Sequence, residues 1–404
     1  MPEAVKTRKF RHSGRFFQIP IYLGKRLRGF IYEMDWKVFP MAAIVAALVA
    51  MVVRKAMFVT MEGTLMGSFA LVCVSIWNGC FNSIQVICRE RGIIKREHRS
   101  GMHISSYIFS HMLYQAFLCF GQTIITLYVC KYSGMKFPAE GFMTGSLIIE
   151  IGISIFLITY AADMLSLLIS AIAHTTTAAM TVMPFILIFQ LVFSGGFFSL
   201  PERARPFSNL TISNYGLKAI AAQADYNHLP MSTGWNTVLK MKGETLTGTI
   251  TVGQMLDLLQ QEDKALIHEI RATEIRKDEI YGITLQLLGG DAGALLLPGV
   301  ENMVSDETIT LGDVIDTVAA DPAVIENREQ TFTTSIRIAD VIDLIGEENA
   351  KRVIEEKSAS ASVVPAYERT KSNIITSWLQ LAAFTALYAL LAVIVLEFID
   401  KDKR

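Results

Sequence analysis

Six apolar stretches, each close to the length of a membrane-crossing helix, constrain the fold of this chain more than any other feature. They cover residues 38–53, 65–88, 104–130, 142–173, 178–198 and 374–399. A helix needs about 20 mainly apolar residues to cross a bilayer. Only 19% of the 404 residues are charged, whereas a soluble domain normally carries about 25%. The sequence therefore predicts a polytopic α-helical membrane protein with six transmembrane helices, not a soluble enzyme.

The distribution of lysine and arginine predicts the orientation of these helices. Basic residues are frequent before the first span, after the second span and in the C-terminal tail, whereas the loops 54–64 and 131–141 carry two each. Because lysine and arginine are enriched in short cytoplasmic loops, both termini are predicted to be cytoplasmic. All five cysteines lie in the second and third spans, and the outer segment has none. This fits a plasma membrane protein, and in particular a bacterial cytoplasmic membrane.

The charge balance separates one long segment from the rest of the chain. Residues 202–371 carry 26 acidic and 16 basic side chains, a net charge of −10, and the remaining residues carry +9. Such asymmetry indicates two parts that face different compartments. The predicted parts are a cytoplasmic basic segment (1–37), transmembrane helices one to five (38–200), an outer re-entrant or cap segment (201–230), an acidic extracytoplasmic α/β domain (231–371), and the sixth helix with a cytoplasmic tail (372–404).

The predicted outer domain contains three similar stretches. Residues 249–259, 308–318 and 335–345 each resemble a short strand that runs into a capped helix. Thr251 and Gln254 have the spacing of a capping box. The intervals between the stretches are unequal, so a solenoid repeat is not indicated. Either an internal duplication or a shared local solution explains the likeness, and the sequence favours the second.

Two charged segments each have two interpretations. Residues 15–37 place apolar side chains at helical spacing with basic side chains between them. This pattern is typical of an amphipathic helix on the cytoplasmic membrane surface, or of a generic basic anchor. Residues 89–103 carry charges of both signs in a short turn between two spans, which indicates either a solvated turn or a surface that docks a partner.

Three ionisable residues lie within the predicted spans, where burial is costly. Asp163 lies well inside the fourth span, Glu150 near its outer end, and His111 near the inner end of the third. A proton pathway or a catalytic pair would need such groups, but a helix–helix hydrogen bond explains them more simply. The sequence has no phosphate-cradling loop, no zinc-binding helix motif and no nucleophile elbow. It therefore predicts no catalytic residue, metal or cofactor in this chain.

One segment resembles a known family. From Glu90, the chain places a second glutamate seven positions later at Glu97, a glycine four residues further at Gly101, and Ser-Ser-Tyr at the start of the third span. This combination resembles the first intracellular loop of G-subfamily ABC transporters. Residues 165–173, 193–201 and 213–219 are similar to other parts of the same family. The resemblance covers roughly residues 15–230 and 372–400, without the family's nucleotide-binding domain.

The resemblance implies a permease subunit that is driven by a separate ABC ATPase, which would bind ATP and Mg²⁺. Two permease units, either two copies or this chain with a paralogue, would pair in the lipid membrane, and nucleic acid is not implied. The loop 89–103 would act as the coupling helix that docks on the ATPase. The residues implied for that coupling are Glu90, Arg91, Arg96, Glu97, Arg99 and Gly101.

The resemblance also implies a central path lined by the second and fifth spans. The side chains that it places in this cavity are Asn78, Phe81, Asn82, Phe185, Phe189 and Gln190. Aromatic and amide groups suit an amphipathic lipid-, peptide- or drug-like substrate, although plain helix packing explains each residue equally well. Gly195, Phe197 and Phe198 would form an outer gate.

Three hypotheses follow. The first is an ATP-driven exporter permease that works by alternating access. The second is a complex that uses ATP to move the large outer domain, which would then act on the cell envelope or on an outer partner. The third, an intramembrane enzyme built on Asp163, Glu150 or His111, is the weakest because no second catalytic group stands at a telling spacing.

Overall fold

The chain divides into two compact units. The computed structural model describes residues 14–32, 34–196, 201–261, 264–276 and 308–398. The bundle unit comprises Met1–Leu229 and Val364–Arg404, and the inserted unit comprises Pro230–Val363. Each unit is described by itself.

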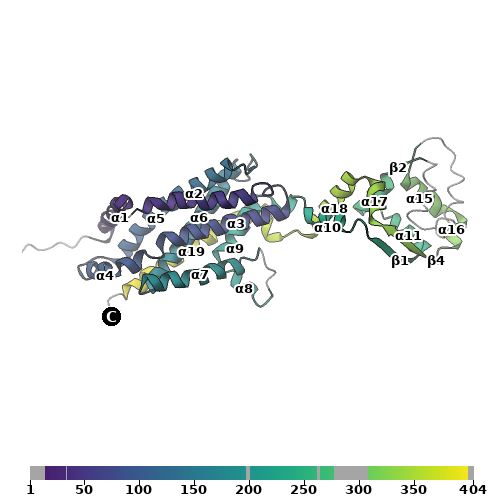
Figure 1. Cartoon of the computed structure of the whole chain (residues 1–404). Helices are drawn as coiled ribbons and strands as arrows, with labels where there is room; N and C mark the ends of the chain where they lie inside the picture. The colour runs from purple at the N-terminus through teal and green to yellow at the C-terminus, as the bar shows by residue number, and fades with distance from the viewer. Residues whose placement is uncertain (1–13, 33, 197–200, 262–263, 277–307, 399–404) are drawn as a thin grey trace, which may run out of the picture. The chain divides into compact units, whose positions relative to one another are not determined.

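The bundle unit is helical throughout its described residues (Figure 1). Its elements are α1 (Arg15–Tyr32), η1 (Asp35–Lys37), α2 (Val38–Val53), α3 (Met61–Ser83), α4 (Val86–Arg99), α5 (Ile104–Tyr132), α6 (Leu147–Ile172), α7 (Thr176–Val192), α8 (Arg205–Ser208), α9 (Ile212–Gln223), η2 (Tyr226–His228), η3 (Pro365–Tyr367) and α19 (Lys371–Glu397). Helices α1 and α4 lie at one end of the bundle and α8 at the other (Figure 1).

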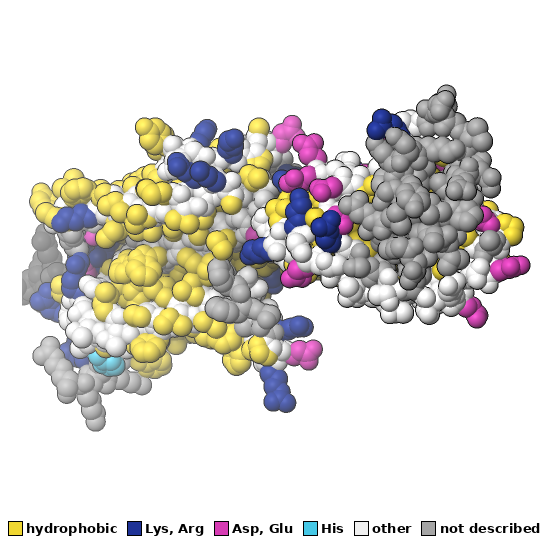
Figure 2. All heavy atoms as spheres, turned by 45° about the vertical axis from the view of Figure 1, so that its right-hand side comes forward, with side chains coloured by type: hydrophobic (Ala, Val, Ile, Leu, Met, Phe, Trp, Pro, Cys, Tyr) yellow, Lys and Arg dark blue, Asp and Glu magenta, His cyan; other side chains and the backbone are white. Residues whose placement is uncertain are grey.

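Five helical segments among the described residues are long and apolar enough to cross a membrane. They are Asp35–Val53, Met61–Arg99 (which combines α3 and α4), Ile104–Tyr132, Leu147–Ile172 and Lys371–Glu397. The bundle unit therefore has the helices of a multi-pass membrane protein. Hydrophobic side chains cover much of its visible face (Figure 2), as a lipid-facing surface requires.

The boundaries of three predicted spans need correction. The span predicted at 65–88 runs across the end of α3 at Ser83 and the start of α4 at Val86. The span predicted at 178–198 is α7, which ends at Val192 with 17 residues, because the chain turns there and Gly195 has a φ of +75°. The span predicted at 142–173 begins only at Leu147. Residues before it form a turn in which the Glu150 carboxylate accepts the backbone N–H groups of Met143 (2.5 Å) and Thr144 (2.8 Å).

The charged loop 89–103 is also more ordered than a turn. The helix α4 occupies Val86–Arg99, and only the residues from Ser100 to His103 link it to α5. Its charges of both signs lie on a helix whose buried residues are Ile87, Cys88 and Ile94. An amphipathic helix lying against the bundle therefore replaces the solvated turn.

Helix α6 forms the centre of the bundle and packs against α3, α5, α9 and α19. Small residues allow the closest approach. A Cβ atom at Gly79 of α3 would lie 2.1 Å from the Thr159 carbonyl oxygen of α6. Ala161 and Ala162, which follow Thr159 in α6, are completely buried. Helix α9, in the segment predicted as an outer cap, is also buried along most of its length.

The inserted unit combines helices with two short antiparallel strand pairs. Its elements are α10 (Ser232–Lys240), β1 (Thr245–Thr251), α11 (Val252–Leu259), α12 (Ala265–Ala272), β2 (Glu274–Ile275), β3 (Ile309–Thr310), α15 (Leu311–Ala320), α16 (Pro322–Glu326), β4 (Thr331–Arg337), α17 (Ile338–Ile345) and α18 (Glu347–Ala361). Strand β1 pairs with β4 from Thr245 opposite Arg337 to Thr251 opposite Thr331. Strand β2 pairs with β3.

The three similar stretches all fold as predicted, as a strand that runs directly into a helix: β1–α11, β3–α15 and β4–α17. Thr251 and Gln254 form the predicted capping box, and Thr310 caps α15.

The likeness extends to tertiary contacts. The sixth residue of each helix is an aspartate that pairs with a basic side chain, in the pairs Asp257–Arg328, Asp316–Arg271 and Asp343–Lys242. The first N–H of each helix is donated to the carbonyl oxygen two residues after that basic residue, namely Gln330, Thr273 and Glu244. A local preference for helix capping does not require matched contacts between distant residues. A shared local solution therefore explains only part of the likeness between the three stretches.

Candidate functional site

Helix α4 begins where α3 ends, and α6 fixes its start. The Ser170 hydroxyl of α6 accepts the backbone N–H groups of Ile87 (3.1 Å) and Cys88 (3.2 Å). These are two of the N–H groups that have no partner within a helix at its first turn. The Arg91 guanidinium donates to the carbonyl oxygens of Ala171 (2.8 Å) and Ala173 (3.2 Å) at the end of α6. The start of α4 is therefore held against the end of α6.

A buried ion pair ties α4 to α1. Arg26 of α1 donates to both carboxylate oxygens of Glu90, at 2.9 and 2.6 Å. It also donates to the Tyr107 hydroxyl at 2.7 Å, and that hydroxyl donates to Glu90 at 3.2 Å. The side chains of Arg26 and Glu90 are only 10% and 13% exposed. Burial acts to lower the pKa of Arg26, but Tyr107 and Glu90 outweigh it and raise that pKa above its usual value. We call Arg26, Glu90 and Tyr107 the clamp.

Weaker contacts continue along the same side of α4. Lys25 of α1 lies 3.1 Å from Glu97, and both side chains are partly exposed. Gln18 of α1 donates to the Gly101 carbonyl oxygen at 3.0 Å and accepts the His103 N–H at 2.9 Å. Gly101 has a φ of +102°, a conformation that favours glycine. The glutamine and the glycine thus shape the turn from α4 into α5.

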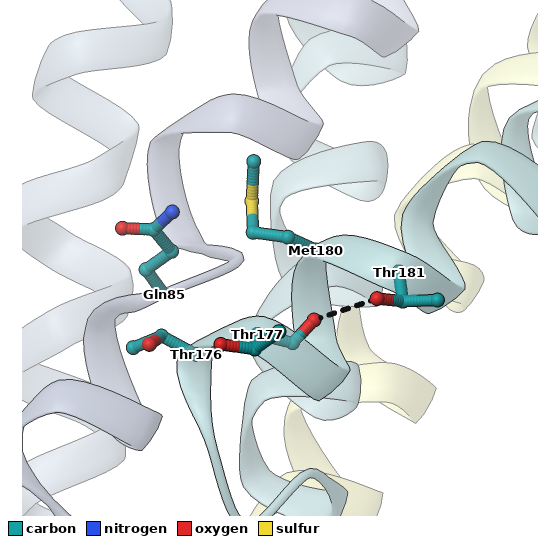
Figure 3. A pocket seen from close by; sticks show the side chains of 5 residues that line it. All are labelled: Gln85, Thr176, Thr177, Met180 and Thr181. Atoms are coloured by element: carbon teal, nitrogen blue, oxygen red, sulfur yellow. Dashed lines mark hydrogen bonds between the residues drawn. The ribbon is translucent and has the colours of Figure 1, made fainter.

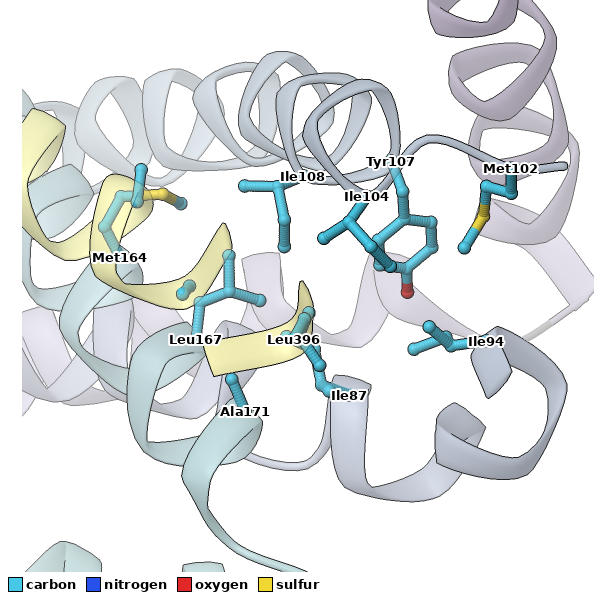
Figure 4. Packing of buried hydrophobic residues seen from close by; sticks show 12 residues of the cluster. Ile87, Ile94, Met102, Ile104, Tyr107, Ile108, Met164, Leu167, Ala171 and Leu396 are labelled. Carbon is cyan, nitrogen blue, oxygen red and sulfur yellow. The ribbon is translucent and has the colours of Figure 1, made fainter. Parts of the chain in front are cut away.

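An apolar cluster includes Tyr107 of the clamp (Figure 4). Ile87 and Ile94 of α4 are completely buried, and they pack in one cluster with Tyr107 of α5, Leu167 of α6 and Leu396 of α19. Four helices of the bundle, α4, α5, α6 and α19, therefore meet in this cluster. A displacement of α4 must act on all of them, since a close-packed interior transmits strain.

The opposite face of α4 is exposed and basic. Arg89, Ile93, Arg96 and Arg99 are all exposed, and their spacing of three to four residues places them on one side of a helix. We call these four residues the outer face of α4. Of the six residues implied for ATPase coupling, Arg96 and Arg99 lie on this face, whereas Glu90 lies inside the clamp.

The structure divides the six predicted cavity residues. Phe81 is 44% exposed and Phe185 is 70% exposed, as side chains that line a path or an interface would be. Asn78 and Gln190 are buried in the bundle. Asn82 exchanges two 3.0 Å hydrogen bonds with Gln122 of α5, so its amide serves helix packing. The sixth residue, Phe189, is half-buried and contacts the ring of Phe193 at 4.8 Å between centroids.

A small pocket lies where the break between α3 and α4 meets the start of α7 (Figure 3). Its volume is about 390 Å³, and its lining is Gln85, Thr176, Thr177, Met180 and Thr181. The Thr181 hydroxyl donates to the Thr177 carbonyl oxygen at 2.9 Å. The pocket thus has a mixed polar and apolar lining and adjoins the start of α4.

The remaining predicted sites fall in two places. Of the outer gate, Gly195 is exposed at the turn after α7, while Phe197 and Phe198 lie outside the described residues. Asp163 and Glu150 are both completely buried in α6. Glu150 accepts backbone N–H groups, as described above, whereas Asp163 lies among side chains of α3 and α5.

The family comparison agrees with this arrangement. A family model described as ABC-2 type transporter matches residues 32–221, which run from the end of α1 into α9. These residues are therefore similar to an ABC-2 type transporter domain. The match supports a permease role in an ABC transporter, and it confirms the predicted recognition at that level. Comparison with individual curated proteins gives no match.

Sequence reasoning missed two residues of the site, Arg26 and Ser170. Arg26 appeared only as one of several basic residues between apolar ones, although its spacing from Gln18 and Tyr22 is that of one helix face. Ser170 gave no signal, because its role depends on the approach of α4 to α6. Both roles come from contacts between residues more than 60 positions apart.

Proposed function

We propose that the chain is the permease subunit of an ATP-driven ABC exporter, and that the outer face of α4 docks on a separate ABC ATPase. The observation that carries the proposal is the construction of α4. Its inner side is fixed by the clamp, by Ser170 and by the apolar cluster. On its outer side, Arg89, Ile93, Arg96 and Arg99 are exposed. A helix held in this way passes a push from a partner to the spans.

In this mechanism, Glu90 acts within the permease. The resemblance gave it a docking role, but its carboxylate is occupied by Arg26 and Tyr107. It links α4 to α1 and α5, so that these helices move together. ATP binding favours one arrangement of the ATPase dimer, and the differential affinity of ATP for the two states supplies the driving energy.

The proposed substrate path lies along α3 and α7. Exposed Trp77, Phe81, Phe185 and Ile188 give these helices an apolar outer surface. A second permease copy or a paralogue would face it, and an amphipathic substrate would pass between the two. In this arrangement α7 is the fifth of six spans, both termini are cytoplasmic, and the pocket at Gln85 and Thr177 lies on the cytoplasmic side.

The first experiment purifies the chain from its native membranes in mild detergent and identifies every co-purifying protein. An ABC ATPase in stoichiometric amount is expected. The double variant Arg96→Glu/Arg99→Glu should lose that ATPase because it reverses the charge of the outer face. The control is Arg205→Glu on α8, an exposed arginine at the other end of the bundle. Retention of the ATPase by the double variant would refute docking through this face.

One observation favours a second candidate, ATP-driven movement of the inserted unit. The chain leaves the bundle after η2 and returns at Val364, and Asn227 exchanges two hydrogen bonds with Val364, at 3.0 and 3.1 Å. Arg369 contacts Asp225 at 3.4 Å, and the rings of Tyr226 and Tyr367 lie 5.3 Å apart. The segment that leaves the bundle unit and the segment that returns to it thus contact each other within that unit.

This contact also makes a clean deletion feasible. Because residues 227 and 364 already touch, a short glycine–serine linker can replace residues 230–363. If the inserted unit is the working part, the deletion will abolish function in cells and leave ATPase activity of the purified complex intact. Transport that survives the deletion would exclude this second candidate.

A further inference from the structure

Asp163 is a carboxyl without a charged partner at the centre of α6. It is 0% exposed. One oxygen, Oδ2, lies 3.7 Å from the Cys119 sulfur of α5, and the other, Oδ1, has no hydrogen-bond partner. It forms no ion pair with any described residue. An isolated carboxylate charge in such surroundings costs several kcal/mol. A proton on the carboxyl removes this cost and provides a hydrogen-bond donor.

A cluster of three polar side chains lies beside this carboxyl. Gln115 of α5 donates from its amide nitrogen to the Ser83 hydroxyl oxygen at 2.8 Å. The His111 Nε2 atom lies 3.3 Å from both of these atoms. All three side chains are at most 1% exposed. The Ser83 hydroxyl also faces the Asp163 carboxyl, so Ser83 lies between the carboxyl and the imidazole.

The hydrogen bonds of this cluster leave several of its polar atoms unpaired. The His111 Nε2 atom has two possible donors, the Ser83 hydroxyl and the Gln115 amide, so the single Ser83 hydrogen can point either to Nε2 or to Asp163. His111 Nδ1 and Gln115 Oε1 have no partner, like Asp163 Oδ1. Unpaired buried polar atoms are rare and call for an explanation. Three of them around one serine indicate a place where a proton can reside and move.

The position of Ser83 connects this cluster to α4. Ser83 is the last residue of α3, and α4 begins at Val86. The start of α4 is in turn tied to α6 through Ser170. A displacement of α4 relative to α6 therefore moves the serine that bridges Asp163 and His111.

We propose that Asp163, Ser83 and His111 form an intramembrane proton site that is linked to α4. The proton resides on Asp163 in the arrangement described. In the transfer step, the Asp163 O–H gives its proton to the Ser83 oxygen while the Ser83 hydrogen passes to His111 Nε2. This leaves an aspartate and an imidazolium, and the serine regains one hydrogen. Movement of α4 displaces Ser83 and thereby controls the transfer; this last step alone rests on the proposed function.

Other titratable groups surround the site. Cys80 of α3, Cys119 of α5 and Tyr160 of α6 face Asp163. Arg26 of α1 acts on His111 from the side of the clamp. Helices α9 and α19 also pack on α6, but none of their described titratable groups bonds to either residue.

The direct test is infrared spectroscopy of the full chain in lipid nanodiscs at neutral pH. A protonated carboxyl gives a C=O stretching band that a carboxylate lacks. We expect one such band that shifts on ¹³C labelling of aspartate and disappears in Asp163→Asn. The matched control is Glu150→Gln, which removes the other completely buried carboxyl of α6 and should leave the aspartate band in place. The labelling needs no substitution, so it decides the question even if Asp163→Asn fails to fold.

Two further measurements test the link to Ser83 and α4. Ser83→Ala should move the band to higher frequency, because the C=O group loses a hydrogen-bonding neighbour. In the complex with its ATPase, a non-hydrolysable ATP analogue should weaken the band in the wild-type chain. Absence of an aspartate band in the chain alone would overturn the proton site, whatever the function. A band that is present but unchanged by ATP would overturn only its link to α4.

Discussion

Replacement of Arg26 by alanine should release α1 from α4. The two side chains of the ion pair are 10% and 13% exposed, so solvent screens their interaction little. Removal of one partner from a buried pair costs about 3–5 kcal/mol, because the other charge stays buried without compensation. Here the change also leaves the Tyr107 hydroxyl without its 2.7 Å donor. The lower figure corresponds to a roughly 100-fold increase in the population of the state in which α1 is detached.

The adjacent residue supplies a matched control. Lys25 also connects α1 to α4, through Glu97 at 3.1 Å, but its side chain is 50% exposed. An exposed pair of this kind contributes about 0.2–1 kcal/mol. Lys25→Ala should therefore raise the population of detached α1 at most about fivefold, although it removes the same charge one residue away.

The assay is hydrogen–deuterium exchange of the intact complex, followed by mass spectrometry of peptides from Arg15–Tyr32. Amide exchange reports the free energy of local opening. Exchange in the second half of α1 should accelerate by about two orders of magnitude in Arg26→Ala. The first half, which Gln18 ties to Gly101 and His103, should change less. Equal acceleration in Arg26→Ala and Lys25→Ala would refute the argument from burial.

Two further outcomes test packing and electrostatics. Gly79→Ala should lower the thermal unfolding midpoint in detergent, because the added Cβ would lie 2.1 Å from an α6 carbonyl oxygen. The control is Gly92→Ala, whose added Cβ would have no atom within 4 Å. This control should leave the unfolding midpoint equal or higher. Hydrogen bonding to Arg271 lowers the pKa of Asp316 in the folded chain. The ionised Asp316 therefore stabilises the fold above the pKa of an aspartate in the unfolded chain, about 3.9. This stabilisation is lost as the pH falls through the lower pKa of the folded state. Asp316→Asn should thus lower the unfolding midpoint of the inserted unit, followed by fluorescence of buried Trp235, at pH 7 and make little difference near pH 3.

Helix positions in the bundle could be predicted closely. The stretches predicted at 38–53 and 104–130 correspond to α2 (Val38–Val53) and α5 (Ile104–Tyr132). Length and apolarity decide whether a segment can lie in a bilayer, and both are local properties of the chain. The strand–helix units of the inserted unit were also visible, because threonine caps such as Thr251 act within four residues.

The break between α3 and α4 was not visible in the same way. The apolar stretch continues through Ile84 and Ile87 to Cys88, so hydropathy extends the span across it. The helix ends at Ser83 because α4 turns to place Ile87 and Ile94 in the apolar cluster. Only the packed neighbours supply the reason for this turn.

The sequence by itself determined that this chain is a multi-pass helical membrane protein with a separate acidic segment, and its loop motif indicated an ABC transporter permease. Tertiary structure decided what each charged residue does. Glu90 and Glu97 look equivalent in the sequence, yet one is buried with Arg26 and the other is partly exposed beside Lys25. The energy of a charge depends on its solvent exposure and its partners, and both are set by helices that are distant along the chain. The same reason separates Asp163 from Glu150: both are completely buried, and their neighbours alone distinguish an unpaired carboxyl from one held by backbone N–H groups.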